Sequence, residues 1–402
     1  MDLSYGAEAE THREQIRAFL AAEWKPDERR GDALREFVRA FRRKAVEEGY
    51  LYRSVPRRYG GSEQPVDVIR AQVVREEFGR ARAPMEVGGN GVNMTVPTLL
   101  ERGTEEQREL FIRKTIEGDY IWGQGYSEPG SGSDLASVRT KAELSPDGAK
   151  WVVNGQKIWT SQGGKATHMF MLVRTEPDAP KHDGITYLLI DLDQPGVTRR
   201  PIRQMTGMEG EDTFYEFFFD GAETPVSWQV GERGQGWYVS RTTLKHERAA
   251  IGGADNLGRQ FAKLVDLARE TGRIGETLVR DRLVEIEARM LSHRYTSYRL
   301  FSCQAAGEEP GPVALMMKLL LTEIGHDIAL LAQELIGAEG LTEPEGAWRR
   351  SGGAPRGPNK WLDQIMGSLG NSIAGGASNI QRNIIAERGL GLPRDLAIAA
   401  ER

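Results

Sequence analysis

The chain has 402 residues, with 53 basic and 58 acidic side chains and a formal net charge of −5. A chain of this length is too long for one small hydrophobic core, so two or three domains are expected. Because basic residues are not in excess, the chain is not expected to bind nucleic acid. The single cysteine, Cys303, excludes an internal disulfide, and the six histidines show no metal-ligand spacing, so we expect a cytoplasmic protein without a metal site.

Residues 1–120 follow the period of helices. The start of the chain predicts no secretory signal, and no apolar run reaches about 18 residues, so no membrane span is predicted. Residues 7–24 place Ile16, Phe19 and Leu20 on one stripe, and residues 34–51 repeat the pattern. We predict an N-terminal helical domain over residues 1–120.

Residues 121–230 change to the period of strands. Four strand-like runs, at 149–161, 168–175, 184–192 and 214–221, are separated by turn residues. Asn154-Gly155 within the first run predicts a hairpin. We therefore predict a middle domain over residues 121–230 that forms a compact antiparallel β-barrel, with a sandwich as the alternative.

From residue 231 the helical period returns. The segment 311–340 opens with Pro312, a residue favoured in a first helical turn. Residues 343–358 are rich in proline and glycine and predict a surface loop. We predict a C-terminal helical bundle over residues 231–402, so the fold class is α+β, in the order helical domain, β-domain, helical domain.

The stretch "GQGYSEPGSGSDLAS", Gly123–Ser137, has two interpretations. A surface loop rich in turn formers is the simpler one. A cofactor-lining loop is the other, because glycines let backbone N–H groups approach a ligand and serine hydroxyls donate to a pyrophosphate or a flavin edge. The stretch is not a Walker loop, and "GERGQG" at 231–236 does not fit the dinucleotide fingerprint.

The pattern S-E-x-x-S-G-S-D-x-x-S at Ser127–Ser137 resembles a signature of the acyl-CoA dehydrogenase family. "VNGQKIWTS" at 153–161 resembles the family's second signature, and "SNIQRNIIAERGLGL" at 378–392 and the order of the domains are similar as well. Tyr126 departs from the small aliphatic residue common at its position. The resemblance implies an enzyme with this three-domain fold that binds FAD and an acyl-CoA.

The resemblance also implies which residues contact FAD. The backbone around Tyr126 and Ser127 would face the flavin pyrimidine edge, and Ser133 would reach the pyrophosphate. Trp159 would pack on the flavin, although outside this motif a tryptophan here is more often a barrel-core residue. The implied FAD residues are Gln124, Tyr126, Ser127, Gly132, Ser133, Trp159, Thr160, Ser161 and Asn379.

In the family's reaction a carboxylate takes the α-proton of the thioester and the β-hydrogen leaves as hydride to flavin N5. Most members place that carboxylate before a Gly-Thr/Ala-Ser element near the C-terminus, and the matching position here is Gly375. A minority, including isovaleryl-CoA dehydrogenase-like enzymes, carries a glutamate on the first long helix after the barrel. "KHERAAIGG" at 245–253 matches that arrangement, which implies Glu247 as the base.

The residue pattern alone leaves a helix-surface ion pair as the alternative role of Glu247. Two carboxylates aimed at one α-carbon would repel, so a single base agrees with the missing side chain at Gly375. The Gly375 N–H is expected to donate to the thioester oxygen. Arg248 adjoins the base and either tunes its pKa or forms a structural ion pair. The implied substrate residues are Ser133, Leu244 and Arg248.

The segments that complete a partner's FAD site in many relatives are altered here. Arg273 and Gly275 are present, but Ile274 stands at a phenylalanine position, and a Gly-Gly-x-Gly element appears as "GAEG" at 337–340. Some bacterial members, among them enzymes acting on steroid side chains, assemble from two unlike subunits. The resemblance therefore leaves a homo-oligomer and a hetero-oligomer open.

The expected function is FAD-dependent α,β-dehydrogenation of an acyl-CoA to the 2-enoyl-CoA. Gly375 favours a branched or bulky acyl group, and an electron-transferring flavoprotein is the expected electron acceptor. One alternative is a flavin oxidase or monooxygenase on the same fold, which would not need Glu247 as a base. Another is a non-catalytic subunit that completes a hetero-oligomeric dehydrogenase.

Overall fold

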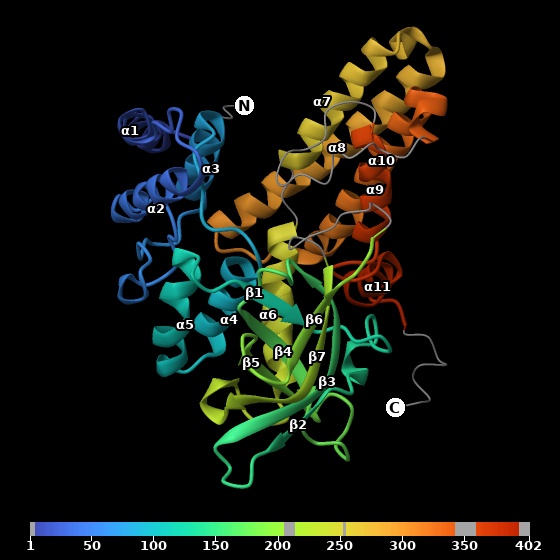
Figure 1. Cartoon of the computed structure of the whole chain (residues 1–402). Helices are drawn as coiled ribbons and strands as arrows, with labels where there is room; N and C mark the ends of the chain where they lie inside the picture. Colours follow the sequence, from blue (N-terminus) through green and yellow to red (C-terminus); the bar gives the residue numbers. More distant parts are fainter. Residues whose placement is uncertain (1–4, 205–213, 252–254, 342–358, 394–402) are drawn as a thin grey trace. The chain divides into compact units, whose positions relative to one another are not determined.

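The computed structural model describes residues 5–204, 214–251, 255–341 and 359–393 (Figure 1). The chain divides into two compact units. The first unit is built from Met1–Gly130, Ala136–Arg199 and Phe217–His246, and the second from Ser131–Leu135, Arg200–Glu216 and Glu247–Arg402. No helix within the described ranges is long and apolar enough to cross a membrane.

Helices open the first unit, as the period of the sequence predicts. Ile16 and Leu20 are buried along the predicted stripe, and Phe41 packs against Phe78 with ring centroids 6.0 Å apart. The predicted helices at 7–24 and 34–51 are confirmed. The helices of this part are α1 Ala7–Glu23, α2 Gly31–Glu47, α3 Val68–Ala81, α4 Val96–Arg102 and α5 Glu105–Glu117.

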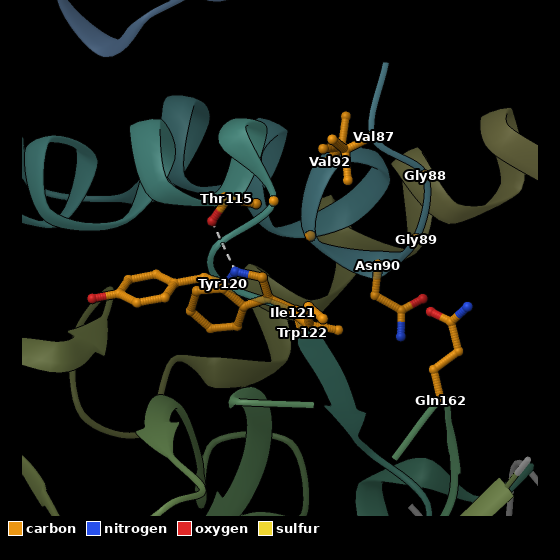
Figure 2. Close-up of a pocket in the computed structure, with 12 residues that line it drawn as sticks. Val87, Gly88, Gly89, Asn90, Val92, Thr115, Tyr120, Ile121, Trp122 and Gln162 are labelled. Atoms are coloured by element: carbon orange, nitrogen blue, oxygen red, sulfur yellow. Dashed lines mark hydrogen bonds between the residues drawn. The ribbon is translucent and has the colours of Figure 1, made fainter. Parts of the chain in front are cut away.

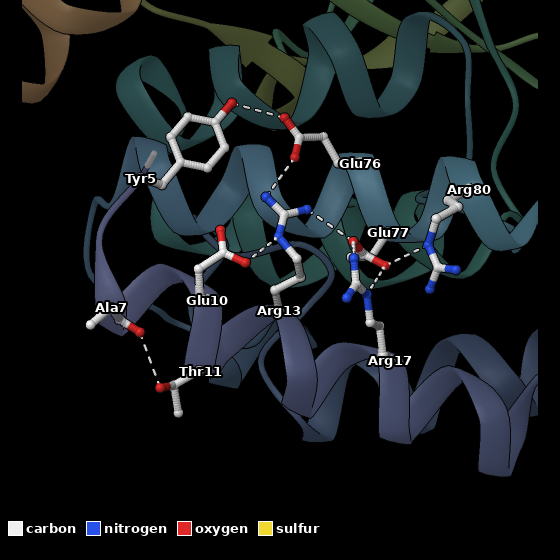
Figure 3. Close-up of polar contacts among 9 residues, drawn as sticks. All are labelled: Tyr5, Ala7, Glu10, Thr11, Arg13, Arg17, Glu76, Glu77 and Arg80. Atoms are coloured by element: carbon white, nitrogen blue, oxygen red, sulfur yellow. Dashed lines mark hydrogen bonds and ion pairs between the residues drawn. The ribbon is translucent and has the colours of Figure 1, made fainter. Parts of the chain in front are cut away.

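A buried carboxylate joins α1 to α3 (Figure 3). Glu77 of α3 is 1% exposed and accepts hydrogen bonds from Arg13 at 2.9 Å, Arg17 at 2.9 Å and Arg80 at 2.8 Å. Burial raises the pKa of Glu77, but the hydrogen bonds from the three arginines outweigh burial and lower the pKa to about 2.

The middle of the chain forms one sheet in the order β6-β7-β3-β2-β4-β5-β8, with β1 paired to β4. The pairs β2–β3, β4–β5 and β5–β8 are antiparallel, whereas β1 and β2 pair with β4 in parallel. The strands are β1 Trp122–Gly125, β2 Lys141–Leu144, β3 Lys150–Ser161, β4 His168–Arg174, β5 Ile185–Asp191, β6 Val197–Pro201, β7 Phe214–Pro225 and β8 Gln229–Val230.

This sheet is open, so the predicted closed antiparallel barrel is wrong. The two end strands do not pair with each other in the described part of the chain. Strand β8 has only two residues, and β6 carries Arg199, Arg200 and Pro201, the charged and proline residues that protect an edge from further pairing. Repeating strand periods do not encode whether the ends of a sheet meet.

The hairpin predicted at Asn154-Gly155 is also wrong, because β3 continues through both residues. A Cβ at Gly155 would lie 2.7 Å from Thr140 Cα, so this glycine permits a close backbone approach. The turn between β2 and β3 lies earlier, at Asp147-Gly148, where Gly148 N–H donates to Ser145 O at 2.8 Å.

Helix α6, Gly236–Ile251, runs from the first unit into the second. In the second unit α9 packs against the other long helices around a core that includes Leu264, Ile328 and Trp361. Pro312 lies in a short turn before α9 rather than within it, and the loop predicted at 343–358 lies outside the described residues. The remaining helices are α7 Asp255–Glu270, α8 Thr277–Ala305, α9 Met317–Ile336, α10 Asn359–Asn371 and α11 Ser378–Ile384.

Candidate active site

A buried lysine connects the predicted cofactor loop to strand β3. Lys157 has no exposed surface, and its Nζ donates to Glu128 Oε1 at 2.8 Å and to Tyr126 O at 3.3 Å. Glu128 also accepts from the N–H groups of Arg139 at 2.7 Å and Thr140 at 2.9 Å. Burial lowers the pKa of Lys157 to about 8, although the charge of Glu128 opposes the shift.

Two further hydrogen bonds fix the loop against β3. Ile158 N–H donates to Ser127 O at 3.0 Å, and the buried hydroxyl of Thr160 donates to Gln124 O at 3.1 Å. The exposed Ser161 is the last residue of β3. The structure therefore holds Gln124 of β1 and Ser127, the first residue of the first signature, against the second signature on β3.

Trp159 is the unusual residue of this group. Its backbone is left-handed at φ 65°, a conformation that costs an L-residue roughly 1–2 kcal/mol, and its side chain is 54% exposed. The alternative of a barrel-core tryptophan is therefore wrong. Strained backbone persists where the surrounding structure enforces it. The exposed indole face of Trp159 offers a planar ligand a surface on which to stack.

The side chain of Tyr126 points into the core, whereas the resemblance gives a role only to its backbone. Tyr126 is 4% exposed, and its ring meets Phe170 edge to face at 5.6 Å. Its ring also lies beside that of Tyr187, whose hydroxyl accepts from Thr243 of α6 at 3.3 Å. The larger side chain at this position is thus accommodated in the interior.

A small cavity lies near the end of β3 (Figure 2). Asn90 and Gln162 point toward one another at its rim, and Trp122 donates to Thr115 Oγ1 at 2.8 Å beside it. Its volume of about 30 Å³ has room for no more than a few water molecules. This cavity is therefore too small for an acyl group.

A second group of predicted residues lies in the second unit. Glu247 is half-buried on α6, and its charge acts on the buried ammonium of Lys318 on α9. Lys318 Nζ donates to Gly376 O at 2.9 Å. Burial lowers the pKa of Lys318, and the charge of Glu247 opposes that shift.

The turn at the position of the missing carboxylate is left-handed. Gly375 has φ 63° and Gly376 has φ 95°. Gln381 of α11 donates from Nε2 to Gly375 O at 3.2 Å. Side chains from α9 and α11 therefore hold the two glycine carbonyls, which fixes the direction of the intervening backbone.

The other predicted residues are spread over both units. Asn379 is exposed at the start of α11, where its Oδ1 accepts from Arg382 at 3.3 Å. Gly132 and Ser133 are exposed in the second unit, and Leu244 is half-buried in the first. Arg248 lies on α6, but its side chain is outside the described residues, as are Gly252 and Gly253.

Two lysines that are buried in the described part of the chain were not among the predicted site residues. Lys157 stands within a quoted signature, yet the pattern does not distinguish its role from those of its neighbours. Lys318 interrupts an otherwise apolar run, "VALMMKLLL" at 313–321, and a lone charge on the apolar face of a helix was the available indication. Both lysines hold backbone carbonyls next to predicted site residues.

Three domain models of one family match the chain. They are the N-terminal, middle and C-terminal domains of acyl-CoA dehydrogenases, over residues 6–119, 123–222 and 234–390. Acyl-CoA dehydrogenase IpdE1 of Mycobacterium tuberculosis is 39% identical over 360 residues, which cover 89% of this chain and 88% of that protein.

Two solved structures share the fold. The Tcur3481-Tcur3483 steroid ACAD has a TM-score of 0.76 at 29% identity, covering 98% of this chain and 100% of that chain. The ChsE4-ChsE5 complex from Mycobacterium tuberculosis has a TM-score of 0.75 at 28% identity, with the same coverage. The chain therefore belongs to the acyl-CoA dehydrogenase family of FAD-dependent oxidoreductases.

Proposed function

We propose that this acyl-CoA dehydrogenase uses Glu247 as its base and acts on a bulky, steroid-derived or branched acyl-CoA. The observation that carries the assignment is that Glu247 is half-buried on α6 while position 375, in a left-handed turn, has no side chain. One carboxylate then serves the reacting carbon, and no second one competes for the proton.

The residues of β1 and β3 fit an FAD molecule. The exposed, strained Trp159 offers a stacking surface, and a Cβ built at Gly132 would meet no atom within 4 Å, so its loop backbone is open to close approach. Trp159, Thr160 and the backbone of Ser127 would hold the flavin, with Ser133 and Asn379 toward the rest of the cofactor. FAD supplies the acceptor for the β-hydrogen when it is bound.

The chain's own residues act on the thioester. The α-C–H bond breaks as its proton moves to a carboxylate oxygen of Glu247. The Gly375 N–H donates to the thioester oxygen, where negative charge develops. Leu244 and Arg248 lie on the helix of the base and would contact the substrate.

The proposed substrate class rests on the glycine at position 375 and on two structural neighbours. Glycine at 375 leaves more room than a glutamate there would, which suits a branched or polycyclic acyl group. One structural neighbour is described as a steroid ACAD and another as a complex of two named chains. We extend both features to this protein, with an electron-transferring flavoprotein as its acceptor.

The test is anaerobic flavin reduction by acyl-CoAs in the wild type and in Glu247→Gln. A sole general base contributes at least about 10²–10⁴-fold, so the variant should lose that factor while it retains FAD. Glu101→Gln is the matched control, because Glu101 contacts His246, next to the proposed base, at 2.6 Å but has no role in the chemistry. Near-normal reduction in Glu247→Gln would exclude the base assignment.

The same variants, with oxygen uptake measured in a parallel aerobic assay, separate the two alternatives. A flavin oxidase or monooxygenase would consume oxygen and would tolerate Glu247→Gln. A non-catalytic subunit would show no bound flavin and no bleaching as an isolated chain, and its complex with the catalytic chain would bleach equally well with Glu247→Gln. Reduction by steroid-derived acyl-CoAs but not by straight-chain ones would support the proposed substrate class.

A further inference from the structure

We infer that Lys318 is a positioning residue of the dehydrogenation site, where its ammonium holds the Gly375–Gly376 turn and is the counter-charge of Glu247. The inference rests on the proposed function, since it concerns the same base. It adds to the site a residue that lies 71 positions beyond Glu247 and 57 before Gly375 in the sequence. Nothing in the sequence signatures points to it.

The geometry gives Lys318 a defined place. The residue is 4% exposed on α9, and its Nζ lies 2.9 Å from the carbonyl oxygen of Gly376. A buried ammonium is costly unless it is hydrogen-bonded and paired with an opposite charge. The carbonyl supplies the first requirement, and Glu247 supplies the second.

Among the described residues, Glu247 is the charged group that acts on Lys318. His293 of α8 is buried, and burial lowers its pKa, so its ring is neutral at pH 7. The described charged side chains of α7 are exposed, and α10 has no described charged side chain. The cations of α8 and α11 that contact α9 have their own partners: Arg282 with Glu334, Arg289 with Asp327, and Arg382 with Glu323.

Lys318 therefore acts on both parts of the proposed site, the base Glu247 and the turn at Gly375–Gly376. The Lys318 charge favours the ionised form of Glu247, the form that accepts a proton. Its hydrogen bond to Gly376 O fixes the turn whose preceding N–H is proposed to contact the thioester. A change at Lys318 should alter the pH at which the base becomes active, which a purely structural residue would not do.

The first experiment measures kcat/KM for flavin reduction against pH in Lys318→Met, Lys318→Arg and Thr322→Val. The acid limb reports the pKa of the base in the free enzyme, and loss of a nearby opposite charge should move it upward by about 1–3 pH units. Lys318→Arg retains the charge and should keep the limb close to its wild-type position. Thr322→Val is the matched control, because among the described residues its buried hydroxyl bonds to carbonyls of its own helix alone.

The second experiment is a double-mutant cycle on urea unfolding with Lys318→Met, Glu247→Gln and the double variant. Coupled charges predict that the double variant loses less stability than the two single losses added together, because no buried charge is left alone. The cycle needs no turnover, so it decides the pairing even if the proposed function fails.

The outcomes are separable. A wild type that reduces no flavin with any acyl-CoA overturns the proposed function and leaves the cycle to judge Lys318. An active wild type with an unmoved acid limb in folded Lys318→Met overturns the positioning role. Additive losses in the cycle overturn the pairing with Glu247.

Discussion

At the scale of single residues, the Lys157–Glu128 pair determines the shape of the predicted cofactor loop. Both side chains are buried, and four of their hydrogen bonds end on the loop or on the two residues just before β2. Removal of one partner of a buried ion pair is costly because the other charge is left without compensation. The pair should therefore matter for folding and for FAD retention together.

Replacement of Lys157 by methionine should lower the free energy of unfolding by about 3–5 kcal/mol. The loop should also separate from β3, so less FAD should remain bound. Urea unfolding and the visible flavin absorbance per chain are the measurements. Lys150→Met is the control: Lys150 lies on the same strand, but its pair with Glu223 is half-exposed and should contribute about 1 kcal/mol or less. Equal effects of the two variants would contradict this account.

At the scale of elements, the link between α1 and α3 depends on ionised Glu77. The pKa of Glu77 falls from its ordinary value of 4.5 to about 2 in the folded protein. A depressed carboxyl pKa stabilises the fold above the unfolded value, and that stabilisation is lost as the pH falls through the interval between the two values. Arg17 then loses the anion that attaches it to α3, and Arg13 is left with Glu76 of the same helix.

The variant Glu77→Gln should destabilise the protein at pH 7 by about 3 kcal/mol. The difference from wild type should shrink as the pH falls from about 4.5 toward 2, because the wild type then loses the same charge. Thermal unfolding at several pH values tests this. The neighbouring Glu76→Gln is the control, since the Glu76 side chain is 34% exposed. A difference that stays constant down to pH 3 would contradict the role of the charge.

The elements also show what a sequence can predict. Helices α1 and α2 were predictable because their apolar period is local. The closure of the sheet and the path of β3 were not, because they depend on contacts such as Gly155 with Thr140, which join separate segments. The resemblance supplied the candidate residues on β1 and β3, but Lys318 acts through α9, far from any signature.

At the scale of the whole molecule, the first and second units each hold part of the predicted site. Trp159 and the loop residues 123–130 lie in one unit, and Ser131–Leu135, Glu247, Gly375 and Asn379 lie in the other. The segment expected to reach a partner's FAD is engaged within its own unit, since Arg273 donates to Glu334 O at 2.7 Å and pairs with Glu276 at 2.8 Å. In the proposed hetero-oligomer, a different chain would supply this contact to the cofactor.

The chain should therefore bind less than one FAD when it is purified alone. Co-expression with a co-encoded chain of the same family should yield a hetero-oligomer with a fixed ratio of FAD to chains. Light scattering coupled to size exclusion, with flavin absorbance per protein, is the measurement. A homo-oligomer with one FAD in every chain would show that the second chain is not needed.

The left-handed backbone at Gly375 has an evolutionary consequence. An acid introduced there would adopt a backbone that costs an L-residue roughly 1–2 kcal/mol, and it would face the carboxylate of Glu247. A return of the acid to position 375 would therefore be opposed both through folding and, in the proposed site, through repulsion between like charges.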